Sequence, residues 1–211
     1  MDILGIDEAG RGSVLGPLVI AGVVIPQKME SVIDNMGVKD SKRLTPKRRE
    51  VLSRKLKKMF DWDVVIYSAQ DIDNMRAQGI NLNEIERRGM QELILKLDFD
   101  KAIVDAVDVK PERFQDKLRK ATGKDVKAEH KADDKYLEVG AASIIAKYAR
   151  DEAIAELNKN YEHMGGIGSG YPSDPKTKEF LSNYTYSQMP DFVRKSWATV
   201  AKLKDVQTTL I

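Results

Sequence analysis

Two apolar segments near the N-terminus predict a β-hairpin. Residues 3–6 are apolar, Gly10-Arg11-Gly12 interrupts the pattern, and a second apolar run extends from Leu18 to Ile25 before Pro26 ends it. Apolar runs of this length on either side of a glycine-containing turn are typical of paired strands. The first chain segment is therefore expected to form two neighbouring strands.

Later in the chain, short apolar runs alternate with segments of helical periodicity. Residues 64–67 and 102–104 are apolar and predict two further strands. Cap residues or prolines precede apolar positions spaced three or four apart, which predicts helices that begin near Thr45, Asn83, Pro111, Val139 and Asp174. At Asn83 the signal is a capping box with Glu86. This order of elements favours an α/β fold, with a mixed sheet flanked by helices.

The chain of 211 residues suits one compact domain with a modest appendage. We assign residues 1–160 to the α/β domain. Residues 161–211 are expected to form a helical C-terminal extension that packs on it and carries a glycine-rich loop at residues 165–170.

Composition narrows the class of protein. Hydrophobic residues make up 42% of the chain and charged residues 32%, which supports a folded core. Cysteine is absent, and this excludes disulfide scaffolds, thiol nucleophiles and thiolate metal sites. The sequence shows no signal-peptide pattern and no membrane-length apolar run. We therefore expect a cytoplasmic protein without membrane contact.

The formal net charge is only +2, but basic residues are concentrated in one segment. Residues 39–58 contain ten Lys and Arg residues and only two acidic ones. Such a segment is consistent with a surface for a polyanion, and equally with the solvated face of a helix.

Carboxylates follow the predicted strands. Asp7 and Glu8 come where the first apolar run stops, Asp105 follows residues 102–104, and Asp133 and Asp134 precede the long helix. If the strand that ends at Asp7 and the strand that ends at Asp105 are parallel neighbours, their carboxyl ends lie side by side at one edge of the sheet, where α/β folds place ligands. Asp133 and Asp134 could reach the same point. Each of these acids alone is as well explained as a helix cap or a solvated turn residue.

Clustered carboxylates need a positive charge to neutralise them. Without cysteine, and with only two histidines in the chain, hard cations held by oxygen atoms are the best candidates, which means Mg²⁺ or Mn²⁺. One geometric problem arises, because successive strand residues point to opposite faces. Asp7 and Glu8 can share a metal pair only if the strand ends or bulges beside them.

The residues around these acids form a series of distinctive sequence blocks. They are Gly5-Ile6-Asp7-Glu8-Ala9-Gly10-Arg11-Gly12, Asp40-Ser41-Lys42-Arg43-Leu44, Ile103-Val104-Asp105, His130-Lys131-Ala132-Asp133, Ala141-Ala142-Ser143-Ile144-Ile145-Ala146-Lys147, and Gly168-Ser169-Gly170-Tyr171-Pro172. Together these blocks resemble ribonuclease HII, the type 2 ribonuclease H family. They follow the family's order, cover most of the chain, and have an archaeal character.

The resemblance implies a ribonuclease H-like fold with a mixed five-stranded sheet. It assigns catalysis and metal binding to Asp7, Glu8, Asp105 and Asp133, with two Mg²⁺ or Mn²⁺ ions in the working complex. The implied activity is hydrolysis of RNA in RNA·DNA hybrids, and cutting on the 5′ side of single ribonucleotides in duplex DNA. The products would carry a 3′-hydroxyl and a 5′-phosphate.

Further roles follow from the same resemblance. Gly10, Arg11 and Gly12 would recognise the ribose 2′-hydroxyl, which distinguishes RNA from DNA, and Tyr171 would sense the junction between a ribonucleotide and DNA. Other residues would bind phosphates or support the site. The expected phosphate ligands are Ser41, Lys42 and Arg43, and the expected supporting residues are His130, Lys131 and Asp151.

Some positions depart from the family pattern or stay open. Leu137, Glu138 and Gly140 stand where Pro, an apolar residue and Ser are expected, which could alter metal affinity or local stability. Residues 207–211 resemble the start of a sliding-clamp binding peptide without its aromatic pair. We expect a monomer. Two alternatives remain: a junction resolvase on the same fold, and a nucleic-acid-binding module without catalysis.

Overall fold

The computed structural model describes residues 1–202, apart from the side chains of Asp40 and Ser41. The chain divides into two compact units, each assembled from separate segments. The first, here called the sheet unit, comprises residues 1–9, 19–66 and 83–149. The second, here called the loop unit, comprises residues 10–18, 67–82 and the chain from Arg150 onward. The predicted domain division after residue 160 stays a prediction.

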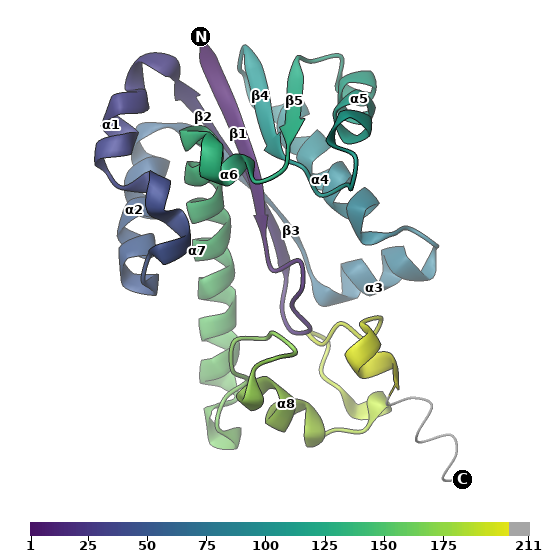
Figure 1. The fold of residues 1–211 in the computed structure, drawn as a ribbon. Coiled ribbons are helices and arrows are strands. Elements are labelled where there is room, and N and C mark those ends of the chain that lie inside the picture. Colours follow the sequence, from purple (N-terminus) through teal and green to yellow (C-terminus); the bar gives the residue numbers. More distant parts are fainter. Residues whose placement is uncertain (203–211) are drawn as a thin grey trace. The chain divides into compact units, whose positions relative to one another are not determined.

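A mixed five-stranded sheet forms the centre of the sheet unit, as predicted (Figure 1). Its strand order is β3-β2-β1-β4-β5. Strand β1 pairs antiparallel with β2 and parallel with β4, and β4 pairs parallel with β5. The strands are β1 (Asp2–Ala9), β2 (Leu18–Pro26), β3 (Asp61–Tyr67), β4 (Lys101–Asp105) and β5 (Val126–Glu129). The predicted hairpin and the two predicted later strands are confirmed.

Helices occupy most of the remaining chain. They are α1 (Glu30–Asn35), α2 (Pro46–Met59), α3 (Ala69–Ala77), α4 (Leu82–Lys96), α5 (Pro111–Thr122), α6 (Ala132–Lys135), α7 (Leu137–Asn160) and α8 (Pro175–Ser182). The predicted caps of α2 and α8 are confirmed: the Thr45 side chain accepts from Arg48 N, and that of Asp174 accepts from Lys176 N. Among the described residues, no helix is long and apolar enough to cross a membrane.

The predicted capping box at Asn83 is wrong. Helix α4 already begins at Leu82, which puts Asn83 within its first turn. Glu86, the expected reciprocal partner, is fully buried on the packed side of the helix. Asn83 and Glu86 therefore both lie within the helix and do not cap it.

Each face of the sheet packs on a different set of helices (Figure 1). Odd-numbered residues of β2, such as Val23 and Ile25, share a core with the small residues of α7 and with Leu52 and Leu56 of α2. The other face meets α4, because a Cβ atom added at Gly22 would lie 3.5 Å from Leu93 Cδ1 of that helix. Alternation along the strands thus separates side chains that point toward α7 from those that point toward α4.

Helix α7 lies unusually close to β1 at Gly5. A Cβ atom at this position would lie 2.2 Å from both the carbonyl carbon and the carbonyl oxygen of Glu138, and 2.6 Å from Val139 N. Backbone atoms cannot move aside as a flexible side chain can. Only glycine allows this contact between strand and helix.

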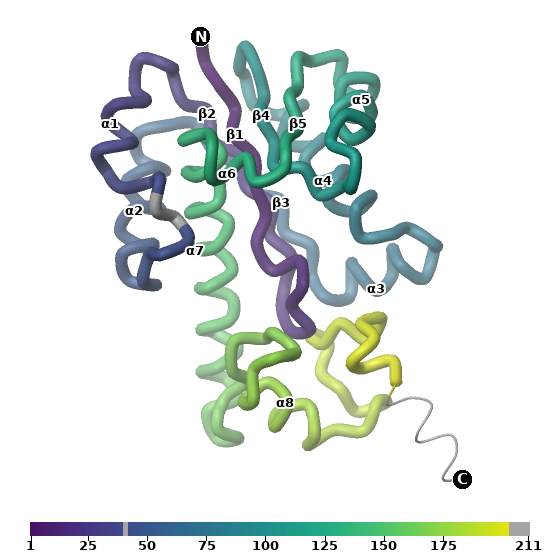
Figure 2. The backbone as a smooth tube through the Cα atoms, viewed as in Figure 1, coloured from purple at the N-terminus to yellow at the C-terminus, as the bar shows by residue number. Residues whose placement is uncertain are grey.

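The loop unit has a separate core rich in aromatic residues. The Phe180 ring makes edge or tilted contacts with Tyr161 and Tyr184, with centroid distances of 5.2 Å in both pairs. An isolated antiparallel bridge between Leu15 and Val193 joins the loop at residues 10–18 to the C-terminal segment (Figure 2). This small core supports the loops that are described below.

We expect Gly5→Ala to destabilise the protein strongly, because the new methyl group must displace the backbone of α7. Overpacking of this kind costs about 1–3 kcal/mol, and backbone clashes belong to the upper end. Chemical denaturation monitored by circular dichroism measures the loss. Gly12→Ala is the matched control, since a Cβ atom at Gly12 meets nothing within 4 Å. Equal stability of both variants would contradict the close contact.

Candidate active site

The parallel ladder between β1 and β4 brings two carboxylates to one edge of the sheet. The last paired residues are Ile6 and Val104. Asp7 and Asp105 follow them directly, so both side chains leave the sheet at the same level. The expectation that these acids meet at the carboxyl ends of neighbouring parallel strands is met in the structure.

Asp7 is buried in this position, with 5% of its surface exposed. Burial, together with the negative charges of Asp105 and Asp133, raises the pKa of Asp7 to about 7, although the Ser143 hydroxyl and the Glu8 N–H act in the opposite direction. Mutual repulsion between three carboxylates is the sign of a site that gains free energy from an added cation.

Asp105 also holds the segment that carries the next acid. Its Oδ1 accepts a hydrogen bond of 3.0 Å from Ala132 N, the first residue of α6. Lys131, just before that helix, has a left-handed backbone with φ of 55°. This conformation costs free energy for any residue other than glycine, and such strain often accompanies functional sites. Burial, followed by the charge of Asp133, raises the pKa of Asp105.

Asp133 faces a lysine. Lys42 Nζ lies 3.2 Å from both carboxylate oxygens of Asp133 and 2.7 Å from Asp134 Oδ1. The hydrogen bond to Asp134 is the main cause that raises the pKa of Lys42. The family resemblance assigned no role to Asp134, but here it shares the lysine with Asp133. No spacing rule connects residue 42 with residue 134, which explains the omission.

Glu8 points away from this group. Strand β1 pairs regularly with β2 through Asp7, Glu8 and Ala9, without a bulge. Asp7 therefore shares the α7 face with Ala9, and Glu8 points toward the face that α4 covers. Asp7 and Glu8 therefore point to opposite faces of the sheet, as expected from the sequence for a strand without a bulge, because β1 continues past both residues to Ala9.

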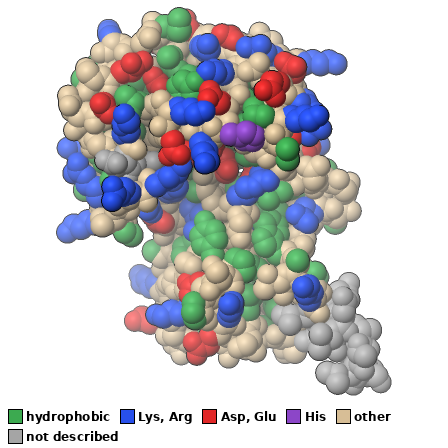
Figure 3. Space-filling model, viewed as in Figure 1, with side chains coloured by type: hydrophobic (Ala, Val, Ile, Leu, Met, Phe, Trp, Pro, Cys, Tyr) green, Lys and Arg blue, Asp and Glu red, His purple; other side chains and the backbone are tan. Residues whose placement is uncertain are grey.

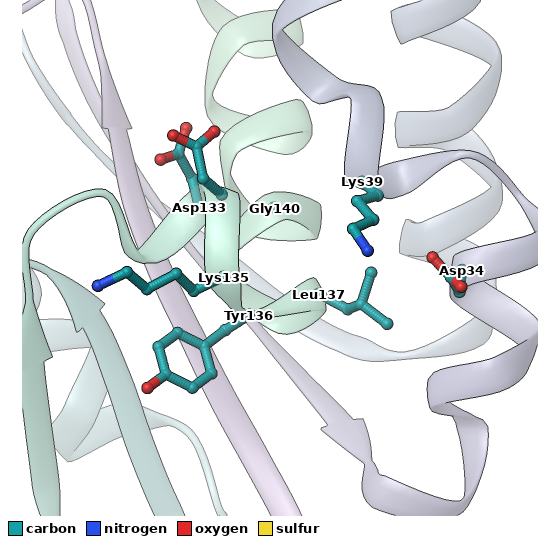
Figure 4. Close-up of a pocket in the computed structure, with 8 residues that line it drawn as sticks. Asp34, Lys39, Asp133, Lys135, Tyr136, Leu137 and Gly140 are labelled. Atoms are coloured by element: carbon teal, nitrogen blue, oxygen red, sulfur yellow. The ribbon is translucent and has the colours of Figure 1, made fainter.

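A cavity of about 180 Å³ adjoins Asp133. Figure 4 shows Asp34 and Lys39 on its opposite side, with Gly140 at its wall. The Tyr136 ring points away from Asp133 in this view, and its hydroxyl donates to Glu129 Oε2 at 2.8 Å. The cavity wall beside Asp133 is thus polar and charged on both sides.

Two of the three positions that depart from the family pattern, Leu137 and Gly140, line this cavity. A Cβ atom at Gly140 would lie 3.3 Å from Asp133 O and 3.4 Å from Val38 Cγ1, which is tight. Glu138 is buried with 3% exposure, and burial raises its pKa. An effect of these departures on metal affinity stays a prediction.

The three expected supporting residues differ in position. His130 lies with Nδ1 3.1 Å from Ala106 O and Nε2 3.3 Å from Val109 O, so its ring is engaged by backbone carbonyls. Asp151 belongs to the loop unit, where its charge acts on Arg150. A role in fastening loops therefore fits His130 better than a role as a base.

The expected recognition residues come together within the loop unit. The Gly170 carbonyl accepts from Val14 N at 2.8 Å and from Leu15 N at 3.1 Å, which joins the loop after Gly10-Arg11-Gly12 to the loop that carries Tyr171. The Tyr171 side chain lies at the surface, with 37% exposure. Two segments more than 150 residues apart thus form one structural element.

The expected phosphate-binding residues lie in a 3-10 helix at residues 38–43. Lys42 and Arg43 are exposed, whereas the Ser41 side chain lies outside the described part of the structure. On the face drawn in Figure 3, blue basic side chains lie among red acidic ones over the sheet unit. This face is mixed in charge, so a polyanion surface along residues 39–58 stays a prediction.

The chemistry of the donor set suits a hard divalent cation. Asp7, Asp105 and Asp133 offer only carboxylate oxygens. Burial and the neighbouring carboxylates together raise the pKa of Asp7 and of Asp105. Within residues 1–202, as far as they are described, no three His, Asp or Glu side chains are already arranged around a single point. The Lys42 ammonium instead supplies positive charge to Asp133.

Comparisons with known proteins agree on one family. A family model described as ribonuclease HII matches residues 4–200. Ribonuclease HII of Methanobrevibacter smithii is 72% identical over 207 residues, which cover 98% of this chain and 100% of the relative. The crystal structure of ribonuclease H2 from Pyrococcus horikoshii OT3 is similar with a TM-score of 0.89 and 42% identity, and covers 98% of both chains.

A further similar structure is that of the PCNA:RNase HII complex from Archaeoglobus fulgidus. It has a TM-score of 0.85 and 44% identity, and the match covers 93% of this chain and 95% of that chain. These matches span nearly the whole chain and both units. The chain therefore belongs to the ribonuclease HII family of divalent-metal-dependent, hydrolytic endoribonucleases.

Proposed function

We propose that this enzyme hydrolyses the RNA strand of RNA·DNA hybrids and cuts on the 5′ side of single ribonucleotides embedded in duplex DNA. The products carry a 3′-hydroxyl and a 5′-phosphate. The observation that carries the proposal is the convergence of Asp7, Asp105 and Asp133 at one sheet edge, where each carboxylate raises the free energy of its neighbours.

Asp7, Glu8, Asp105 and Asp133 are the residues that would hold two divalent cations, either Mg²⁺ or Mn²⁺. When bound, such ions supply Lewis-acid stabilisation of the attacking and leaving oxygens in an in-line phosphoryl displacement. Glu8 is included because it lies beyond Ile6, the last β1 residue that pairs with β4. Strand alternation turns the Glu8 side chain toward the other face, so its place in this set rests on the family resemblance.

Lys42 has two chemical uses in this site. Its ammonium offsets the charge of Asp133, and Asp134 keeps it at that position. A mobile cation next to the carboxylates is also suited to contact a substrate phosphate. Ser41 and Arg43 are proposed to add phosphate contacts, which make affinity decrease with salt by about 0.9 in log–log slope for each neutralised phosphate of duplex DNA.

Recognition of the ribonucleotide is assigned to the loop unit. Gly12 supports this, because no atom lies within 4 Å of the position of its missing Cβ, so the backbone is open to close approach. Main-chain groups of Gly10, Arg11 and Gly12 can both donate to and accept from a 2′-hydroxyl. Tyr171, at the surface beside this loop, would stack on the sugar or base at the junction with DNA.

The two alternatives are weaker. A junction resolvase has no 2′-hydroxyl to recognise, so this alternative does not explain the open backbone at Gly12 or the adjacent Tyr171. An inactive binding module leaves the costly burial of repelling carboxylates without a purpose. Family membership argues against both.

A sliding clamp is a proposed partner. The similar protein from Archaeoglobus fulgidus was solved as a PCNA:RNase HII complex. In this chain the proposed contact is the C-terminal segment at residues 207–211, which lies outside the described residues.

The first experiment uses a DNA duplex with one ribonucleotide, an all-DNA duplex and an RNA·DNA hybrid, each with Mg²⁺ or EDTA. We expect metal-dependent cutting on the 5′ side of the single ribonucleotide, cutting of the hybrid, and no cutting of DNA. Gel analysis of end-labelled strands gives the cut position. Cutting of the hybrid alone would remove the junction-sensing role, and cutting of neither would contradict the proposed activity.

Asp105→Asn and Asp133→Asn are each expected to lower the cleavage rate at least about 100-fold, because loss of one ligand oxygen charge weakens stabilisation of the transition state. Hybrid binding, measured by fluorescence anisotropy, should stay within about threefold. Asp116→Asn, on the exposed side of α5, is the matched control and should be fully active. Full activity of either site variant would overturn the carboxylate assignment.

Tyr171→Ala should lower kcat/KM more for a single embedded ribonucleotide than for an all-RNA hybrid. A stacking contact is worth about 1–3 kcal/mol, which corresponds to about 5- to 150-fold. The RNA strand of a hybrid offers many positions for cleavage, so the hybrid depends less on recognition of one junction. Equal losses on both substrates would show that Tyr171 does not sense the junction.

A further inference from the structure

The loop unit buries two arginines without a carboxylate to pair with them. Arg194 has no exposed surface and Arg150 has 6%. Within the described residues, the structure records no ion pair for either guanidinium. Burial, followed by the positive charge of Arg150, lowers the pKa of Arg194 to about 9. Two like charges buried in one small core are costly, so their contacts should matter.

Arg150 contacts both recognition loops. Its Nη2 donates to Ser13 Oγ at 2.9 Å, in the loop after Gly12, and to Ser169 O at 3.0 Å, in the loop before Tyr171. The same guanidinium lies 4.8 Å from the centroid of the Tyr171 ring, a cation–π distance. One planar group therefore fixes the first loop, the second loop and the aromatic ring.

The glycines around Arg150 make room for this arrangement. A Cβ atom at Gly10 would lie 2.6 Å from Arg150 Nε, and one at Gly170 would lie 3.1 Å from Arg150 Nη2. Both glycines also have positive φ angles, of 86° and 82°. Gly10 thus differs from Gly12, where an added Cβ atom would meet nothing within 4 Å. The first glycine of the Gly-Arg-Gly motif serves the packing of Arg150, and the second stays open.

Arg194 holds the same loop at two other points. Its Nε donates to Gly16 O at 3.1 Å and its Nη1 to Arg11 O at 3.2 Å. Its guanidinium lies 4.7 Å from the Trp197 ring centroid, and its backbone N donates to Val14 O at 2.9 Å. The loop is therefore fixed from Arg11 to Gly16 by one buried side chain, independently of Tyr171.

We propose that Arg150 is a positioning residue that locks Tyr171 to the Gly10–Ser13 segment, so that both act as one rigid reader of a ribonucleotide. Arg194 holds the loop in place, whereas Arg150 connects it to the tyrosine. This inference rests on the proposed function and deepens it. Selectivity for a single ribonucleotide then depends on Arg150, although Arg150 itself is buried and need not contact the substrate.

The test compares Arg150→Lys with Tyr171→Ala and with the double variant. Lysine keeps the charge but cannot both donate through a planar fork and stack on the ring. We expect Arg150→Lys to lower the ratio of kcat/KM for a single ribonucleotide to that for an all-RNA hybrid by about tenfold, within the range of a desolvated cation–π contact. The double variant should lose little more than Tyr171→Ala, because the residues act as a unit.

Phe180→Leu is the matched control. It weakens the core of the same unit but changes no hydrogen bond of the two loops, and it should leave the ratio unchanged at equal loss of thermal stability. Ser13→Ala is a milder second variant in case Arg150→Lys folds poorly, and it should lower the ratio in the same direction. An unchanged ratio in both variants, or losses that multiply in the double variant, would overturn the proposal.

Hydrogen exchange separates this proposal from the proposed function. Arg150→Lys should accelerate exchange at the Val14 and Leu15 amides, which donate to Gly170 O, together with exchange in residues 168–171. This readout needs no substrate. If the wild-type enzyme fails to cut a single ribonucleotide but the two loops loosen together, the mechanical coupling holds and the substrate assignment fails. Unchanged exchange in both loops would overturn the coupling itself.

Discussion

The close contact between α7 and β1 at Gly5 determines the geometry of the active site. Two residues along a strand advance about 6.8 Å, and five residues along a helix advance about 7.5 Å. From the contact between Gly5 and Glu138, these steps lead to Asp7 on the strand and to Ser143 on the helix. The hydroxyl that lowers the pKa of Asp7 is thus at its level because the backbones touch where glycine allows it.

The same contact also fixes the segment that precedes α7. Helix α6 ends at Lys135, two residues before α7 begins, and Gly140 N donates to Tyr136 O at 3.0 Å. Gly140 leaves space for the Asp133 carbonyl beside the helix. Asp105 completes the frame through its bond to Ala132 N. The third carboxylate is therefore held by backbone contacts on both sides, and its repulsion by Asp7 cannot relax by a simple movement of the chain.

The fold was largely predictable because its signals are local. Apolar runs predicted β1 and β2, although β1 extends to Ala9, beyond its apolar run, and the beginnings of α2, α7 and α8 were predicted within about two residues. The strand β5 gave no pattern of its own, since Val-Lys-Ala-Glu has only two buried positions, Val126 and Ala128. Its strand conformation depends on pairing with β4, which is a long-range interaction.

Site residues that belong to sequence motifs were predictable. Contacts between residues far apart in the sequence were not. Their positions after strands and before a helix suggested that Asp7, Asp105 and Asp133 lie close together, and the family motifs gave them their proposed role. The link from Lys42 to Asp134 and the burial of Arg194 have no local signal, because a single Lys or Arg in a polar context is normally solvated. Each becomes recognisable only when the fold surrounds it with specific acceptors.

Each unit contains a group of like charges, negative in the sheet unit and positive in the loop unit. In the sheet unit, like-charged carboxylates are concentrated so that added cations are favoured, and the cost is a raised pKa at Asp7 and Asp105. In the loop unit, like-charged guanidiniums are buried, where they donate to backbone carbonyls and the Ser13 hydroxyl and lie over aromatic rings. The carboxylate group favours the binding of added cations, whereas the two buried arginines stabilise the conformation of the loops. Chemistry and recognition can therefore be altered separately, because a change in one set of like charges leaves the other set intact.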